Sequence, residues 1–411
     1  MIYVSPFKLN DAEKTLTELS HYDGVIVFGT GNTGIVVLSA LKKAGISVVC
    51  LSDNNKHRWG KIINGHKIVP PKDLKSINNQ TPILIAVDLN FPYIRRQLKD
   101  LGLTNVYDCD FIFSKLDLDL KECNISWSEN KLKSKIDLYV YSVLAHRDKK
   151  NSLKVDSVDL MLTEKCSLKC KDCSNLMQFY AKPIDEDYNL VIASIDIFMD
   201  TVDYVQEIRL LGGEPLMYKK VDLVINHLLK YKNFGQIKIN TNGTIAPKEE
   251  KLKAFQNEKI YFDIANYGKE SRNAEALVKE LTKMKIAHNI AHVTEWQDVG
   301  KIVKTNRTEN ENKEVFGNCC TSRSLTTLHG KLYLCPFAAN ATNLKAIPHT
   351  KKDIIDLNIT DKKELRKQIH NLYFNTEYLD ACKSCNGRDH NVPKVKAALQ
   401  AKTPISYELV K

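Results

Sequence analysis

The feature that most constrains this chain is the uneven distribution of its 11 cysteines. Their number is odd, and the chain starts MIYVSPFKLN, without the basic and apolar segments of an export signal. We therefore expect a cytoplasmic protein without a disulfide framework, in which gathered thiolates bind metal. Cys50, Cys109 and Cys123 are isolated, whereas the other eight form a first group, Cys166, Cys170 and Cys173, and a second group, Cys319, Cys320, Cys335, Cys382 and Cys385.

The first cysteine group follows a predicted strand, VDLMLT, with the spacing C-x3-C-x2-C. Three thiolates on one short loop can ligate three irons of a cubane and leave the fourth iron without a protein ligand. That open iron can chelate the amino and carboxylate groups of S-adenosylmethionine (SAM). Zinc is the competing interpretation, but a tetrahedral zinc site needs a fourth ligand close by.

This cysteine motif resembles that of the radical SAM superfamily, and two later segments fit the resemblance. EIRLLGGEP predicts a strand that ends in a Gly-Gly-Glu-Pro turn, and IKINTNGT predicts another strand. The resemblance implies that the turn binds the methionine amino group and that the second strand meets the SAM carboxylate or ribose. The residue before the third cysteine is usually aromatic in this superfamily, but here it is Asp172. The implied SAM-binding residues are Gly212, Gly213, Glu214, Pro215, Asn240 and Thr241.

The predicted fold class is α/β. Strands and helices alternate from Val155 to about Val303, as in a partial (β/α)6 barrel, which we assign to residues 155–310. Tyr267, Lys269 and Trp296 follow late strands and are candidates for the pocket lining, although surface or core positions are the plainer interpretation.

The second cysteine group has the spacing C-x9-G-x4-C from Cys320 through Gly330 to Cys335, then 46 residues, then Cys382-x2-Cys385. This pattern resembles the twitch form of the SPASM extension and implies one auxiliary [4Fe–4S] cluster in residues 311–395. Structural zinc remains the alternative. The segment LHGKLYLC predicts a hairpin. Residues 396–411 are expected to be a tail.

Cys319 is the spare cysteine of the second group, because the spacing favours Cys320 as the ligand. Three roles stay open for Cys319: a bystander, the true ligand, or a catalytic thiol that donates hydrogen to a substrate radical.

The N-terminal part, residues 1–118, predicts a Rossmann-like domain, followed by a connector over 119–154. A strand at 24–29 leads into Gly29, Gly31 and Gly34 of a G-x-G-x-x-G loop, then a helix, a strand and Asp53. Such glycines let the backbone approach a phosphate, and the acid can bond a ribose. Strands at 82–88 and 105–108 continue the alternation.

The segment that follows, DNNKHRWGKIINGHKIVPPKDL, resembles the N-terminal nucleotide-sugar-binding domain of bacterial sugar acetyltransferases. The resemblance implies a bound nucleotide or nucleotide-sugar. A scaffold that binds nothing and a catalytic NAD site are the alternatives.

The formal net charge is +11, but the lysines are scattered, so we expect neither a nucleic-acid nor a membrane partner. The twitch-like arrangement resembles enzymes of the 2-deoxy-scyllo-inosamine dehydrogenase type. It implies a radical SAM oxidoreductase with two [4Fe–4S] clusters and SAM, reduced by an external donor such as flavodoxin or ferredoxin. The expected substrate is a sugar, nucleotide-sugar or cyclitol, which is dehydrogenated or epimerised. A peptide-modifying maturase and a non-enzymatic iron–sulfur protein are the other hypotheses.

Overall fold

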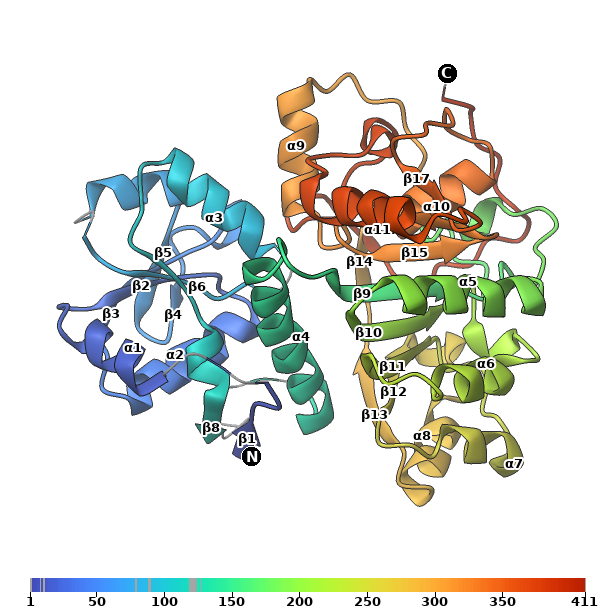
Figure 1. Cartoon of the computed structure of the whole chain (residues 1–411), viewed down its shortest axis with the longest axis horizontal. Coiled ribbons are helices and arrows are strands. Elements are labelled where there is room, and N and C mark those ends of the chain that lie inside the picture. Colours follow the sequence, from blue (N-terminus) through green and yellow to red (C-terminus); the bar gives the residue numbers. More distant parts are fainter. Residues whose placement is uncertain are drawn as a thin grey trace. The chain divides into compact units, whose positions relative to one another are not determined.

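The computed structural model describes the chain except for positions 1, 8, 10, 11, 78, 79, 88, 89, 118–122, 124, 126 and 411. Two compact units divide the chain, Met1–Arg147 and Asp148–Lys411 (Figure 1). Asp88, the end of the predicted strand 82–88, and positions 118–122 lie outside the described residues. No helix in the described part of the chain is long and apolar enough to span a membrane.

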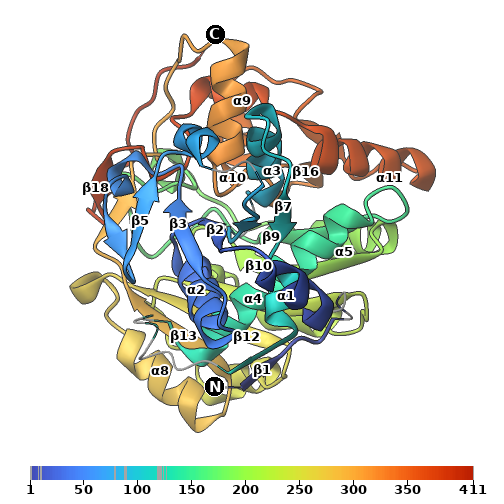
Figure 2. The same cartoon turned by 90° about the vertical axis from the view of Figure 1, so that its left-hand side faces the viewer.

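The first unit is built on a six-stranded sheet with the order β4-β5-β3-β2-β6-β7, in which only β4 is antiparallel to its neighbour. Figure 2 shows β5, β3 and β2 side by side. The first of the parallel strands, β2, lies in the middle, so the strand order reverses between β2 and β6, where ligands bind in open α/β sheets. The elements are β1 Ile2–Val4, α1 Ala12–Ser20, β2 Val25–Phe28, α2 Asn32–Lys43, β3 Val48–Ser52, β4 Ile62–Ile63, β5 His66–Val69, β6 Ile83–Ile85, α3 Phe91–Asp100, β7 Val106–Asp108, β8 Lys115–Asp117 and α4 Glu129–Arg147.

Helix α4 corrects the predicted connector over 119–154, because it belongs to the first unit. Tyr139 on this helix is fully buried; its hydroxyl donates to the Ile85 carbonyl oxygen and accepts from the Cys109 amide, both at 2.8 Å. The first unit therefore ends at Arg147 and not at residue 118. The many Lys and Ser residues of this stretch concealed its apolar face, which consists of Leu132, Ile136, Tyr139, Val140 and Val143.

The second unit contains an eight-stranded sheet with the order β13-β12-β11-β10-β9-β15-β16-β17. Strands β9 to β13 are successive and parallel. The elements are β9 Lys154–Met161, α5 Tyr188–Thr201, β10 Tyr204–Leu211, α6 Val221–Leu228, β11 Phe234–Thr241, α7 Glu249–Leu252, β12 Ile260–Asn266, α8 Ala274–Lys283, β13 Ala287–His292, β14 Glu295–Gln297, α9 Glu309–Asn318, β15 Leu325–Leu328, β16 Lys331–Tyr333, α10 Pro336–Asn343, β17 Ile354–Asp356, α11 Lys362–His370 and β18 Lys394–Lys396.

The sheet joins the regions that the sequence predicted as separate. Strand β15 pairs in parallel with β9, and both are labelled in Figure 1. The predicted hairpin, confirmed as β15–β16, extends the sheet from there. Five successive parallel strands stand where six were predicted, and in the described residues the next parallel strand, β15, lies on the opposite side of β9. Residues 155–310 and 311–395 therefore share one sheet and one core. The predicted tail over 396–411 begins within a paired strand, since Lys396 is the last residue of β18, which is antiparallel to β14.

The two faces of strands β9 to β13 differ in polarity. Residues such as Val158, Ile208 and Ile239 belong to the apolar core with residues of α5 and α6. The opposite face is polar, because the registers align Asp159, Arg209 and Lys238 across three strands and Asn240, Asp263 and Asn289 across three. A charged face inside a packed unit needs partners, and Arg209 donates to Asp159 at 2.5 Å while Lys238 lies 3.2 Å from Glu207.

Candidate iron–sulfur sites

The first cysteine group lies on the loop that follows β9 and packs against the Gly-Gly-Glu-Pro turn after β10. The amides of Gly213 and Glu214 donate to the carbonyl oxygens of Thr163 and Lys165 at 2.8 and 2.9 Å. A Cβ at position 213 would stand 2.3 Å from the Lys165 oxygen and 2.7 Å from the Cys166 Cβ. Only glycine fits at this contact. The structure therefore brings together Gly213 and Cys166, two of the predicted site residues; the binding of SAM by this turn stays a prediction.

Glu214 has no exposed surface, and its carboxylate is engaged within the protein. It accepts hydrogen bonds from the Thr241 hydroxyl and the Asn242 amide, both at 2.8 Å, and from the Leu216 amide at 3.2 Å. Burial raises its pKa to about 7, against the lowering effect of these donors. The carboxylate thus ties the turn to the end of β11, a role that the sequence did not predict; direct contact with the SAM ammonium stays a prediction.

Asn242 is a residue of this site that the sequence reasoning missed. Its side-chain amide nitrogen lies 3.6 Å from the Cys166 sulfur and 3.2 Å from the Ser167 hydroxyl. The predicted neighbours are Asn240, which is half-buried, and Thr241, which is buried and bonded to Glu214. The position of Asn242 in the run NTNGT, one residue beyond Thr241, was the sequence signal that could have identified it.

The surroundings of the first group are apolar and aromatic. Leu168, Cys170 and Ala398 are buried together, with Cys166, Cys173, Tyr267 and Trp296 packed against them. The rings of Tyr267 and Trp296 lie edge to face, with their centroids 5.4 Å apart. Lys269, the third candidate for the pocket lining, is exposed. Burial is the main cause that raises the pKa of Cys166 and Cys173, and it raises the pKa of Cys170 to about 12. Bound iron would offset this cost by stabilising the thiolates.

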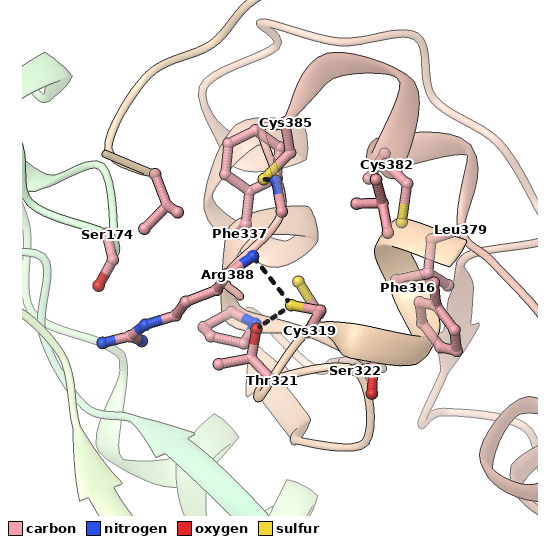
Figure 3. A pocket seen from close by; sticks show the side chains of 16 residues that line it. Ser174, Phe316, Cys319, Thr321, Ser322, Phe337, Leu379, Cys382, Cys385 and Arg388 are labelled. Atoms are coloured by element: carbon pink, nitrogen blue, oxygen red, sulfur yellow. Dashed lines mark hydrogen bonds between the residues drawn. The ribbon is translucent and has the colours of Figure 1, made fainter. Parts of the chain in front are cut away.

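The second group lines a cavity that Figure 3 shows from close by. The sulfur atoms of Cys319, Cys382 and Cys385 face this cavity, and Cys335 also lines it. The cavity is otherwise lined mainly by apolar residues, including Phe316 and Phe337. Four thiols around a shared space are a donor set that suits an iron–sulfur cluster.

Cys319 and Cys320 thus exchange the places that the spacing predicted for them. Cys319 lines the cavity, and its sulfur lies 3.4 Å from the Arg388 amide and 3.3 Å from the Thr321 hydroxyl. Cys320 is exposed and is absent from the cavity lining. Cys320 lies near Arg209, on the polar face of the sheet. Asp159 and Glu207 raise the pKa of the Arg209 guanidinium most, and Cys320 adds to their effect. Alternation along an extended segment explains the exchange, since Cys319 has φ −75° and ψ 123°.

Backbone amides and one arginine support the cavity. The Ala338 and Gly387 amides lie 3.5 and 3.3 Å from the sulfurs of Cys335 and Cys385. Arg307, which the sequence reasoning missed, donates to the carbonyl oxygens of both Cys382 and Cys385. The arginine therefore fixes the Cys-x2-Cys turn from outside.

Neither group is arranged around a single ion position: across the described ranges, no three His, Cys, Asp or Glu side chains could jointly ligate one metal ion. In a cubane each thiolate ligates its own iron, so the thiolates of a cluster site need not converge on one ion position.

The glycine loop of the first unit connects β2 to α2. A Cβ at Gly34 would stand 2.0 Å from the Gly29 oxygen, so close packing requires glycine there, whereas a Cβ at Gly31 would meet nothing within 4 Å. Asp53 does reach the loop, but its carboxylate accepts from the Thr30 amide and the Asn55 amide, both at 2.8 Å, and from the Thr30 hydroxyl. Its predicted bond to a ribose stays a prediction.

Arg58 is a further residue at this loop that the sequence reasoning missed. Its guanidinium donates to the Thr30 carbonyl oxygen and lies 2.8 Å from the Thr30 hydroxyl. A cation beside a glycine loop at a helix N-terminus adds to the attraction of this place for an anion.

Two family matches cover separate parts of the chain. Residues 21–106 match the family "C2185-like, N-terminal", and residues 160–306 match the radical SAM superfamily.

Curated relatives match over limited lengths. The chain is similar to the GTP 3',8-cyclase of Syntrophomonas wolfei, 28% identical over 122 residues, which are 28% of this chain and 36% of the relative. It is also similar to that of Aliarcobacter butzleri, 27% identical over 160 residues, 37% of this chain and 46% of the relative. The mitochondrial protein of that name from Arabidopsis thaliana is 32% identical over 97 residues, 23% of this chain and 24% of the relative. The chain thus spans less than half the length of these relatives.

Solved structures match more of the chain at low identity. They include anSMEcpe with bound AdoMet (13% identity, TM-score 0.38, 62% of this chain and 93% of that one) and BtrN with AdoMet and 2-DOIA (14%, 0.33, 57% and 93%).

The superfamily match at residues 160–306 includes the cysteine loop, the Gly-Gly turn and strands β10 to β13. The chain therefore carries a radical SAM superfamily domain, which implies a [4Fe–4S] cluster and S-adenosylmethionine.

Proposed function

We propose that this protein is a radical SAM oxidoreductase that acts on a sugar, nucleotide-sugar or cyclitol. Cys166, Cys170 and Cys173 would hold the cluster, which together with SAM would supply a 5'-deoxyadenosyl radical for hydrogen abstraction from a substrate carbon. The observation that carries the substrate class is the polar face of strands β9 to β13. Its aligned charged and amide side chains suit a ligand rich in hydroxyl groups.

The protein's own residues hold and order this site. Gly213 allows the turn to touch the cysteine loop, and Glu214 fixes Thr241 and Asn242 at the end of β11. Asn242 in turn directs its amide toward the Cys166 sulfur. These contacts set the position of the reacting groups before substrate binds, which is the main contribution that a protein makes to cofactor chemistry.

We further propose a second, auxiliary [4Fe–4S] cluster, held by Cys319, Cys335, Cys382 and Cys385 in a twitch-like arrangement. The cavity that these four cysteines line supports it. In the dehydrogenation of a secondary alcohol, the C–H hydrogen atom would join the 5'-deoxyadenosyl radical to form 5'-deoxyadenosine. The O–H proton would pass to solvent and one electron to the second site, which leaves a ketone. An external flavodoxin or ferredoxin reduces the protein.

The first unit, we propose, is a Rossmann-like domain that binds the nucleotide part of the substrate. The order of its parallel strands, the open space at Gly31 and the cation at Arg58 support this proposal. We accordingly propose that the partner of this unit is a small molecule and not nucleic acid or a membrane.

Two alternatives remain in the same superfamily. A peptide-modifying maturase would use the same two clusters on a peptide. The printed name of the relatives, GTP 3',8-cyclase, adds a purine nucleoside triphosphate as a candidate substrate.

Substrate-dependent formation of 5'-deoxyadenosine tests the proposal. Reduced, reconstituted protein is incubated with SAM and separately with nucleotide-sugars, cyclitols, GTP and peptides, and 5'-deoxyadenosine is quantified by chromatography. An increase of about tenfold or more over the substrate-free rate with a sugar or cyclitol is expected. An increase with GTP alone or with a peptide alone would replace the proposed substrate class.

A further inference from the structure

In the C-terminal segment 394–401, the residues after β18 pair with the loop of the first cysteine group. After β18, Cys170 and Gln400 form an antiparallel bridge. The Lys171 amide donates to the Leu399 oxygen at 2.7 Å, and the Ala401 amide donates to the Lys169 oxygen at 2.6 Å. The segment thus forms an isolated bridge with a loop that lies about 230 residues earlier.

The side chain of Gln400 extends this pairing to the cysteine itself. Its oxygen accepts from the Lys169 amide at 2.7 Å. Its amide nitrogen donates to the Ala398 oxygen at 2.7 Å and lies 3.4 Å from the Cys170 sulfur, within hydrogen-bond range for sulfur. Ala398 is buried against Leu168 and Cys170, so the same segment also covers the loop with apolar surface.

An N–H donor beside a ligand sulfur changes the properties of an iron–sulfur cluster. Reduction adds negative charge that spreads over the sulfurs, and a donated hydrogen bond stabilises that charge. The reduction potential therefore rises with each such bond. Asn242 supplies a side-chain amide to Cys166, and Gln400 supplies one to Cys170.

We propose that Gln400 is a positioning residue, through which the C-terminal segment holds the Cys170 loop and raises the reduction potential of the cluster. The inference rests on the proposed function, because it takes Cys166, Cys170 and Cys173 as the ligands of that cluster. It assigns a role in the chemistry to a segment for which the sequence predicted only a tail.

Two variants of Gln400 test the proposal in the full-length, reconstituted protein. Gln400→Glu keeps an oxygen for the Lys169 amide but replaces the N–H donor near the Ala398 oxygen and the Cys170 sulfur, whereas Gln400→Leu removes all three contacts. Thr403→Ala is the matched control, because Thr403 follows that segment by two residues and has an exposed side chain. Iron content is measured first. A redox titration then follows the EPR signal that changes on addition of SAM, which identifies this cluster.

Both Gln400 variants should shift the midpoint to more negative potential. At the wild-type midpoint, the ratio of reduced to oxidised cluster should fall about threefold or more, most in Gln400→Glu because of its added negative charge. Loss of this cluster alone, with the auxiliary iron retained, would equally support the proposal, as long as Thr403→Ala keeps both. An unchanged midpoint in both variants with full iron content would overturn it. Absence of a SAM-responsive cluster in the wild type would instead refute the proposed function.

Discussion

At the residue scale, the two adjacent cysteines 319 and 320 carry the most specific information. Cys319 shares a cavity with three other cysteines, and Cys320 is exposed near Arg209. The spacing favoured Cys320, but the pattern that begins at Cys319 differs from it by only one residue. The backbone direction at the end of α9 decides which thiol enters the cavity, and this depends on the packing of the whole second group.

Substitution of either cysteine alone should therefore have opposite effects on the iron content. Cys319→Ser should lose the auxiliary cluster, so that iron falls from about eight to about four per chain. Cys320→Ser should keep about eight irons, because its thiol does not line the cavity. Iron and sulfide analysis after anaerobic reconstitution measures both. The reverse pattern would restore the ligand set predicted from the spacing.

The Cys320 thiol also offers a way to distinguish epimerisation from dehydrogenation. Epimerisation needs a hydrogen donor opposite the abstraction site, and Cys320 is now the candidate, whereas dehydrogenation needs no such thiol. We expect a ketone and a fully active Cys320→Ser variant. Once the substrate is known, the reaction in deuterium oxide measures this. Deuterium at an inverted carbon that is lost in Cys320→Ser would show epimerisation.

Glu214 should influence SAM binding through the network that it orders. Gln at this position would turn an N–H group either toward the Thr241 and Leu216 donors or toward the Asn242 amide, at a cost of roughly 1–3 kcal/mol. Glu214→Gln should weaken SAM binding about tenfold or more, as measured by isothermal titration. Unchanged affinity would mean that the network is not coupled to the SAM site.

At the element scale, the hairpin β15–β16 joins the second cysteine region to the first. Its turn residue His329 lies 2.7 Å from Glu186 and 3.4 Å from Glu164, which follows β9. Hydrogen bonds with Glu164 and Glu186 raise the pKa of His329 to about 9. The imidazolium thus binds the hairpin to the segments on both sides of the cysteine loop.

The stability that this contact provides should depend on pH. Because the folded pKa is raised, the contribution is fully present below pH about 6.5 and is lost as pH rises through about 9. Discounted for the partial exposure of His329, it amounts to roughly 1–2 kcal/mol. Urea unfolding at pH 6.5 and pH 10 measures it. His329→Asn, which tolerates the φ of 50° at this position, should abolish that share of the pH dependence. An equal dependence in the variant would exclude this source.

The glycine loop of the first unit offers a test that separates binding from folding. Gly31→Ala places a methyl group in open space, so unfolding should be unchanged, but the methyl group would block the approach of a phosphate. Binding of a UDP-sugar, measured by titration calorimetry, should fall about tenfold or more. Equal binding in wild type and variant, or none in either, would argue against the nucleotide site.

On the scale of the whole molecule, the sequence predicted motifs better than boundaries. The G-x-G-x-x-G loop, the turn at Gly212 and the hairpin at Gly330 were predictable because they depend on local backbone geometry. The packing of helix α4 into the first unit, the pairing of Gln400 with the cysteine loop and the shared sheet were not, because each depends on contacts between residues far apart in the chain. Asp53 illustrates the same limit: its approach to the loop was predictable, but its bonds to Thr30 were not.

The most direct test of the account is SAM cleavage in a chain that lacks the first cysteine group. Cys166, Cys170 and Cys173 are changed together to Ala, and 5'-deoxyadenosine and methionine are quantified after chemical reduction with SAM. The account predicts both products from the wild type and neither from the variant, which should still hold about four irons in the second group. Undiminished SAM cleavage by the variant, or none by a wild type that holds about eight irons, would contradict it.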